Sequence, residues 1–517
     1  SPAARQTEVW QRYGRWYAQK AQYLHALQAF EHCGDRDAAL AVIEADAGDL
    51  LASLSPAELL QRLDRCPVEA LQRHPLAILV LMRRMFTWQQ IPKMMELKAL
   101  LEAAVAQHPE WPAAERGNLL GECDLIQSFL FYNDITQMSR LHRSASRQMS
   151  RPAVTLRNSG SWTFGSPSVP DDVLPRPRGA GQRTGRKCTS VWPHYYKITN
   201  GHGQGAELLM DAEAAYLQGA WEKATVLLER ARADAAGQEN MTLCCDFLAL
   251  RLALCGKGKE GYDFAAKRAA LLQKHDGVQV HLLESIAAYF YALQGRPEQA
   301  PELFREHKLA EVSFFGPCRP MMSLIEQQVW LAQGEYVKVI AHSEGLLRRC
   351  EAMHYGLVGL QARIQLAAAQ LRFGQRAEAR AALAAALLDA VQDDFWVLFV
   401  EQYPALAPLL EGEDWAASEP RLGPFVARIL PAGRAFAARL GLPAPAPELP
   451  LTDRDRELAR LVAGRCTNKE IAAALYLSEG TVKQYINQLY AKLDMGGDPR
   501  TRRARLAEWY QKNAPRN

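Results

Sequence analysis

A glycine-centred break recurs along the middle of the chain at nearly constant intervals. Each break separates one helix-like apolar segment from a second that opens with spaced alanines, as in "AAYLQGAWEKATVLLERA" and "AQLRFGQRAEARAALAAAL". The breaks at Gly219, Gly256, Gly295, Gly334 and Gly374 are 37 to 40 residues apart, which is room for two ~15-residue helices and their turns. Such a hairpin cannot bury its apolar face alone, so the units must stack. The sequence therefore predicts an all-α chain built around a curved solenoid.

Composition fits this class and argues against several others. The 517 residues are 48% hydrophobic and 23% charged, which is ordinary for a globular protein. No apolar run approaches the ~18–20 residues of a membrane-spanning helix, so we expect no membrane partner. The ten cysteines form no C-x-x-C pair, so we expect no disulfide framework and no metal site. We also expect no cofactor, and a reducing cytoplasm as the location.

Changes in composition divide the chain into segments. The repeat spacing is close to the ~34-residue tetratricopeptide period, and an earlier copy of the pattern surrounds Gly34. Solenoids of this kind bind ligands far more often than they catalyse, so we expect a small-molecule or protein signal on the solenoid and no enzyme activity. The predicted segments are a helical segment 1–45, helical repeats 46–167, an irregular segment 168–192, tetratricopeptide-like repeats 193–440, a Pro-rich linker 441–450 and a C-terminal domain 451–517.

The irregular segment 168–192 breaks the helical pattern with Pro, Arg and Gly. One interpretation is a long exposed loop. The alternative is a local frameshift in the coding sequence, restored near Trp192. Codons from Pro170 onward, read from their second base, can encode an apolar helical stretch that suits a solenoid better. Both interpretations remain open from the sequence.

Positive charge is concentrated at the C-terminal end. Residues 451–517 contain 13 Lys/Arg and 8 Asp/Glu, a net charge of +5, whereas the whole chain carries +4. The other 450 residues are therefore close to neutral. A polyanionic partner would be attracted to this end of the protein.

The sequence of residues 452–495 predicts three capped helices, of which the last two are short and flank a tight turn. Thr452 with Asp455 and Thr467 with Glu470 have capping-box spacing, and Ser478 can cap the helix that follows. Beyond Ser478, apolar residues recur at steps of 4, 3 and 4, which places them on one face of a helix; they are Val482, Ile486, Leu489 and Leu493. This arrangement is typical of a helix-turn-helix, whose second helix enters the DNA major groove.

Polar side chains occupy the opposite face of that second helix. Lysine donates to guanine, and asparagine or glutamine pairs with adenine. The predicted base-reading residues are Lys483, Gln484, Asn487 and Gln488. The predicted phosphate contacts are Thr467, Asn468, Lys469, Ser478, Thr481, Tyr485 and Lys492. Double-stranded DNA is the expected partner, bound by a homodimer on two half-sites.

These residues strongly resemble the LuxR-type DNA-binding domain. The matching positions include Leu451-Thr452, Gly464, Asn468–Ala472, Thr481-Val482-Lys483 and Lys492-Leu493. The resemblance implies a small four-helix domain in a bacterial transcription regulator, with Lys483, Gln484 and Asn487 as base readers. It also implies a dimerisation surface near 501–510. Tyr485 departs from the pattern, because many members have His there.

The domain order also looks like that of large ATP-dependent activators of the maltose-regulator type. In that group a P-loop NTPase precedes the repeats, but no G-x-x-x-x-G-K-[ST] motif occurs in this sequence. The resemblance implies that the chain is the C-terminal part of such an activator, or a stand-alone regulator, and we expect the former. The remaining alternative is a helical-repeat interaction scaffold without DNA binding.

Overall fold

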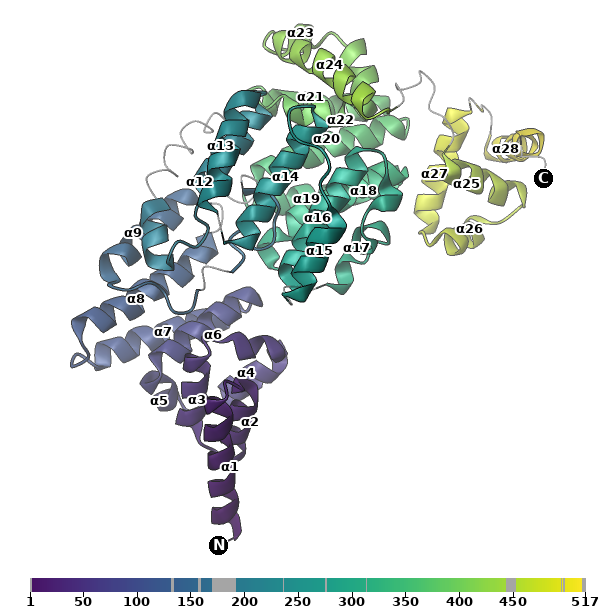
Figure 1. The fold of residues 1–517 in the computed structure, drawn as a ribbon. Helices are drawn as coiled ribbons and strands as arrows, with labels where there is room; N and C mark the ends of the chain where they lie inside the picture. Colours follow the sequence, from purple (N-terminus) through teal and green to yellow (C-terminus); the bar gives the residue numbers. More distant parts are fainter. Residues whose placement is uncertain are drawn as a thin grey trace.

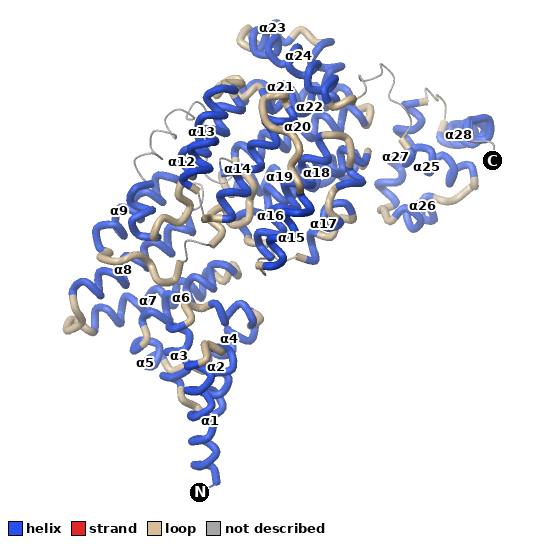
Figure 2. The backbone as a smooth tube through the Cα atoms, in the orientation of Figure 1, coloured by secondary structure: helices blue, strands red, loops and turns tan. Residues whose placement is uncertain are grey.

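The computed structural model describes residues 2–131, 134–156, 160–169, 192–235, 237–274, 277–312, 314–442, 452–493, 495 and 498–513. Regular structure in these residues is helical, and Figure 2 draws no strand among them. The predicted all-α fold is confirmed. None of the helices in these ranges combines the length and apolar character that a membrane crossing requires.

The N-terminal region is a helical array with a core of its own. Its first helix projects away from the rest of the molecule (Figure 1). Local sequence fixes the start of α4: Ser55 and Glu58 form a capping box, and Pro56 occupies the first helical position. The helices are α1 (Pro2–Gln19), α2 (Tyr23–His32), α3 (Arg36–Ala45), α4 (Pro56–Asp64), α5 (Val68–Arg73), α6 (Pro75–Thr87), α7 (Ile91–Gln107), α8 (Ala113–Ser128) and α9 (Ile135–Gln148), with the 3-10 turns η1 (Asp49–Ser53) and η2 (Phe129–Phe131).

The middle region contains the predicted hairpin repeats. Consecutive helices such as α12 and α13, or α20 and α21, pack against each other as antiparallel pairs. The helices are α12 (Ala206–Leu217), α13 (Trp221–Asp234), α14 (Glu239–Leu254), α15 (Phe264–Gln273), α16 (Gly277–Leu293), α17 (Glu302–Arg305), α18 (Arg319–Gln333), α19 (Tyr336–Ala352), α20 (Gly356–Arg372), α21 (Arg376–Ala390), α22 (Val397–Gly412), α23 (Trp415–Ser418) and α24 (Leu422–Arg439), with η3 (Pro297–Gln299), η4 (Leu309–Glu311) and η5 (Gly316–Cys318).

The glycines that define the repeat lie where a helix ends. All five have positive φ, between 68° and 87°, a conformation that only glycine adopts at little cost. Gly219 also needs to be small, because a Cβ there would lie 2.1 Å from Trp396 Cζ2. The glycines that recur in the sequence therefore mark the positions at which helices end in a left-handed conformation.

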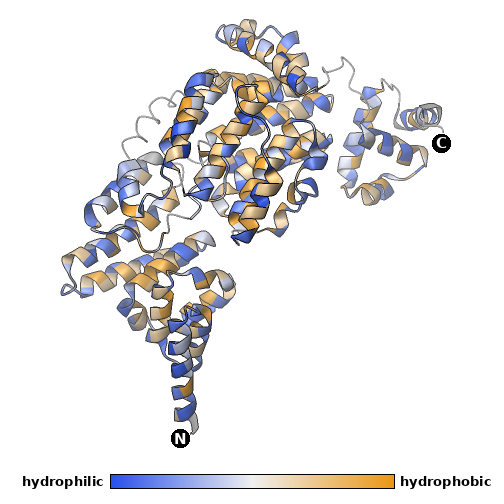
Figure 3. Ribbon diagram, viewed as in Figure 1, coloured by the Kyte–Doolittle hydropathy of each residue, from blue (hydrophilic) through white to orange (hydrophobic). Residues whose placement is uncertain are grey.

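One hydrophobic core runs through the repeats, from Val169 to Phe436, and a second fills the N-terminal region. Hydrophobic residues dominate many helices between α12 and α22, whereas the C-terminal helices are more hydrophilic (Figure 3). Trp162 and Tyr196 pack against both cores, so the two regions are continuous. Ile198, placed with the later repeats by the sequence analysis, belongs to the N-terminal core.

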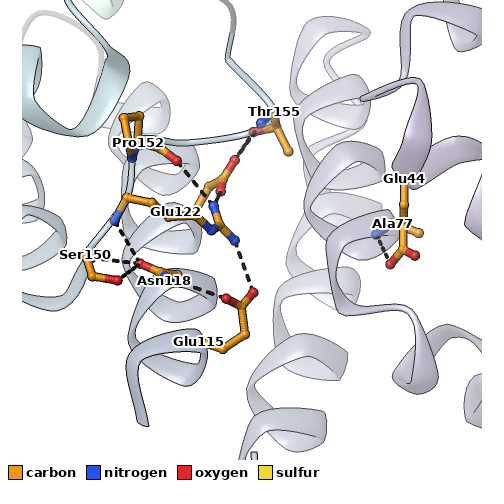
Figure 4. A network of polar contacts seen from close by, with 9 residues as sticks. Glu44, Ala77, Glu115, Asn118, Glu122, Ser150, Pro152 and Thr155 are labelled. Atoms are coloured by element: carbon orange, nitrogen blue, oxygen red, sulfur yellow. Dashed lines mark hydrogen bonds and ion pairs between the residues drawn. The ribbon is translucent and has the colours of Figure 1, made fainter. Parts of the chain in front are cut away.

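Buried polar side chains fix the described parts of the connecting segment, residues 150–156 and 160–169. Glu122 in α8 accepts hydrogen bonds from the Thr155 backbone N–H and hydroxyl, both at 2.7 Å (Figure 4). Asn118 Oδ1, one turn away, accepts from the Ser150 N–H at 2.8 Å. Further on, Asn240 accepts from the Trp162 N–H at 2.9 Å. Because buried backbone groups must be paired, these side chains substitute for the missing secondary structure.

The irregular segment 168–192 is described only at its ends. Ser168 donates to Glu213 at 2.6 Å, and the Val169 N–H donates to the same carboxylate at 3.1 Å. Residues 170–191, where the frameshift is hypothesised, lie outside the described residues. The frameshift therefore stays a hypothesis.

A buried ion pair joins the two ends of the repeat array. Glu401 in α22 accepts from Arg251 in α14 at 2.8 and 3.2 Å, and the two side chains are 2% and 4% exposed. Tyr216 and Tyr289 donate to the same carboxylate at 2.7 and 2.9 Å. The carboxylate thus has four donors, which is what a charge in the interior requires. The array curves until α22 contacts α12 and α14, instead of extending as an open ribbon.

Replacing Glu401 with leucine should destabilise the repeats. Arg251 would stay buried without its counter-ion, and breaking a buried pair costs about 3–5 kcal/mol. Urea denaturation of Glu401→Leu would measure the loss. The exposed pair of Arg348 and Glu344, whose side chains are 70% and 80% exposed, is the control, because Arg348→Ala should cost less than about 1 kcal/mol. Equal losses for the two variants would contradict this role of Glu401.

Candidate nucleic-acid interface

The C-terminal domain contains four helices around a small core. They are α25 (Asp453–Ala463), α26 (Asn468–Leu475), α27 (Glu479–Lys492) and α28 (Pro499–Asn513). Both predicted capping boxes are present, with Thr452 paired to Asp455 and Thr467 to Glu470. Hydrogen bonds from the Thr467 backbone N–H and hydroxyl lower the pKa of Glu470, so this cap is fully formed at neutral pH.

The turn between α26 and α27 has the predicted helix-turn-helix form. α26 ends at Leu475, and Tyr476 takes a left-handed conformation with φ 55°. Ser478 then caps α27 by accepting from the Thr481 N–H at 3.1 Å. α25 ends at Ala463, where the cap residue Gly464 has φ −73° and the left-handed residue is the following Arg465.

The apolar seam of α27 is buried as the periodicity indicated. Val482 and Leu489 are 0% exposed, and Ile486 is 4% exposed. The seam packs on Leu458, Ile471 and other residues of the domain core. Because the seam fixes the rotation of the helix, the opposite side chains must point away from the core.

The predicted base readers lie on that opposite side. Lys483, Gln484 and Asn487 are exposed, and Gln488 is half-buried. Their side chains offer both donors and acceptors. The structure therefore brings together three of the four predicted base readers on one accessible face of α27.

Five of the seven predicted phosphate contacts lie near the starts of α26 and α27. Thr467, Lys469 and Ser478 are exposed near the starts of α26 and α27, where backbone N–H groups favour anions. Asn468 and Thr481 are half-buried and already have partners. Arg503 donates to Asn468 Oδ1 at 3.1 Å, and the hydroxyls of Thr481 and Ser478 lie 2.7 Å apart.

The structure gives Tyr485 and Lys492 other partners than DNA. Lys492 Nζ lies 2.6 Å from Asp455 Oδ2, and both side chains are only 8% exposed. Tyr485 is 7% exposed, and burial raises the pKa of its hydroxyl. The sequence analysis assigned Tyr485 and Lys492 to phosphate because their spacing along the helix places them beside the predicted base readers. The tertiary contacts instead bury them, so this conformation does not support either assignment.

Sequence analysis missed the role of α28 in shaping this site. Arg503 also donates to the Cys466 carbonyl oxygen and thereby links α28 to the start of α26. The Arg502 guanidinium lies over the Tyr490 ring, 5.2 Å from its centre. Four arginines between 500 and 505 were the available signal, but they indicated only a basic tail.

Comparison with known proteins identifies this domain. Residues 449–501 match the family of bacterial regulatory proteins named luxR. An uncharacterised transcriptional regulatory protein, YvfU of Bacillus subtilis, is 41% identical over 75 residues, 14% of this chain and 36% of its own length. The DNA-binding transcriptional activator DevR/DosR of Mycobacterium tuberculosis is 42% identical over 65 residues, 13% of this chain and 29% of its own.

Each of these relatives matches only a small part of this chain. The chain spans about a third of the length of the two curated relatives described above. No solved structure matches it significantly. The C-terminal helices α25, α26 and α27 therefore belong to a helix-turn-helix domain of the luxR family of bacterial regulators, attached to an array of helical repeats.

Proposed function

We propose that this protein is a DNA-binding transcriptional regulator whose α27 reads base edges in the major groove. One observation carries the proposal: Lys483, Gln484 and Asn487 are exposed on one face of a helix whose other face is locked into the core. That helix lies in residues that match the luxR family. DevR/DosR, a relative over 65 residues of this chain, is named as a DNA-binding transcriptional activator.

The proposed binding unit on DNA is a homodimer. Helix-turn-helix domains of this size contact one half-site each, and two-fold pairing places them about one helical turn apart. The exposed residues of α28, among them Thr501 and Arg505, support a pairing surface on that helix. We also place the protein in the cytoplasm, because the nine cysteines among the described residues are present as thiols.

We assign signal binding to a groove in the repeats. The groove lies between α19, α20 and α21 and has a volume of about 1120 Å³. Arg363 and Asp389 line it together with the apolar Leu388, which is 40% exposed. Charged groups beside an apolar wall suit a small polar ligand or a peptide.

A ligand found by a thermal-shift screen should lose its stabilising effect in Arg363→Glu if it binds in this groove.

Lys483→Ala should weaken binding to a selected DNA site by about 1–3 kcal/mol and relax base choice at one position. The site can be selected from a random duplex pool, and affinities measured by fluorescence anisotropy. Lys469→Ala is the matched control, because both lysines are exposed. Lys469→Ala should weaken binding to all DNA sequences about equally, and it should reduce the slope of log K against log salt by about 0.9.

The two lysine variants also separate this function from an interaction scaffold. A scaffold predicts protein binding with little salt dependence and no DNA affinity in either variant or the parent chain. An unchanged DNA affinity in both variants would contradict the assignment of this face of α27.

Lys492→Ala should lower the stability of the C-terminal domain and leave the salt slope unchanged. Asp455 would keep its hydrogen bonds from Thr452 but lose its counter-ion, at a cost of about 3 kcal/mol. Thermal unfolding and salt titration of DNA binding measure the two effects. If the variant is stable and its slope of log K against log salt is smaller by about 0.9, the result would instead support the phosphate contact that the sequence analysis assigned to Lys492.

A further inference from the structure

The recognition helix α27 also touches the repeats. Figure 1 shows α27 on the side of the C-terminal domain that faces them. The Tyr485 ring meets the edge of the Phe373 ring, with centres 5.7 Å apart and planes at 88°. Phe373 follows α20, and Val337 lies at the start of α19; they are 5% and 6% exposed and belong to the same hydrophobic cluster as the domain core.

This contact extends beyond one aromatic pair. Tyr336 and Ile340 of α19 pack against the same cluster. A Cβ at Gly334 would lie 3.8 Å from Thr452 Cγ2, so the turn before α19 also abuts the start of α25. We call the repeat side of this contact, made by Tyr336, Val337, Ile340 and Phe373, the docking surface.

The contacting side of α27 adjoins the base-reading side. Thr481, Tyr485, Gln488 and Lys492 follow one another at steps of 4, 3 and 4, so they form one stripe along the helix. An α-helix with its side chains is ~10–12 Å wide and the major groove is ~12 Å wide, so DNA backbone flanks the helix on both sides. The backbone on the Tyr485 side would occupy the space that the docking surface fills.

From these contacts we infer that the repeats hold the recognition helix in a docked state that excludes DNA. The occupant of the docking surface is this chain's own α27, and duplex DNA competes with it. The inference rests on the proposed DNA-binding function and names the step at which that function is controlled.

Polar groups beside Tyr485 are poorly hydrogen-bonded in the docked contact. Glu335 and Arg454 both interact electrostatically with Tyr485. Glu335 Oε2 and Arg454 Nε are buried without a hydrogen bond among the described residues, although Lys338 Nζ lies 3.7 Å from Glu335 Oε2. Release returns such groups to water. The Pro-rich linker predicted from the sequence lies outside the described residues from 443 to 450.

The docking surface and the groove lie at opposite ends of the same two helices. α19 contributes Tyr336 to Ile340 to docking and Glu344 to Glu351 to the groove. α20 begins at the groove with Gly356, and Phe373 directly follows its last residue. A ligand that shifts α19 against α20 would therefore change the docking surface directly.

Phe373→Glu tests the inference in the full chain, because it places a charge in the apolar contact while α27 keeps its sequence. If about one parent molecule in ten is undocked, the variant should bind the selected duplex about tenfold more tightly. Small-angle X-ray scattering should show a larger radius of gyration. Val337→Glu is the second disrupting variant, and circular dichroism verifies that each variant is folded. Val226→Glu, at a position 60% exposed on α13, is the control and should change neither quantity.

The outcomes separate the two proposals. Tighter DNA binding with an expanded chain in either disrupting variant supports the docked state. Unchanged affinity in both folded variants overturns it, with or without expansion, and leaves DNA binding in place if Lys483→Ala still weakens it. Absence of binding to the selected duplex, and to a mixed-sequence duplex at low salt, in the parent and all variants overturns the DNA-binding function itself.

Discussion

A helical hairpin cannot bury its apolar face by itself, and the architecture of this protein follows from that constraint. Each repeat gains its core only from its neighbours, so one continuous cluster runs from Val169 to Phe436. In this array the late helix α22 contacts the early helices α12 and α14. The Glu401 carboxylate, surrounded by Arg251 and two tyrosines, requires α22 to return to α14. The curvature brought about by this closure decides which repeat surfaces are left for other contacts.

In the proposed function, the C-terminal domain uses the single helix α27 both to read DNA and to dock on the repeats. One side of α27 is fixed in the core by Val482 and Leu489, so the remaining surface is presented in a defined orientation. Lys483 and Asn487 are open to solvent, whereas Tyr485 is covered by Phe373. In the proposed regulator no separate inhibitory segment is needed, because α19 and the end of α20 already supply the surface that competes with DNA. The family match covers the helix itself but not Phe373.

Local patterns were the reliable part of the prediction. The caps at Thr452, Thr467 and Ser478 and the buried seam of α27 are confirmed, because they depend on residues three or four positions apart. The assignments of Tyr485 and Lys492 to phosphate used the same spacing but concerned what lies beside the helix. Their neighbours, Phe373 and Asp455, are 112 and 37 residues away, and spacing along one helix carries no information about them.

The sequence alone determined the helical class, the repeat spacing, the position of the helix ends and the face of α27 that must be apolar. These follow from backbone geometry, since a left-handed glycine, a capping side chain and a 3.6-residue period act within a few residues. Only the tertiary structure decided that α22 closes onto α14, that Glu122 and Asn240 hold an irregular segment, and that the repeats cover one flank of the recognition helix. Each of these depends on burial, and burial is set by segments that meet only after the chain has folded.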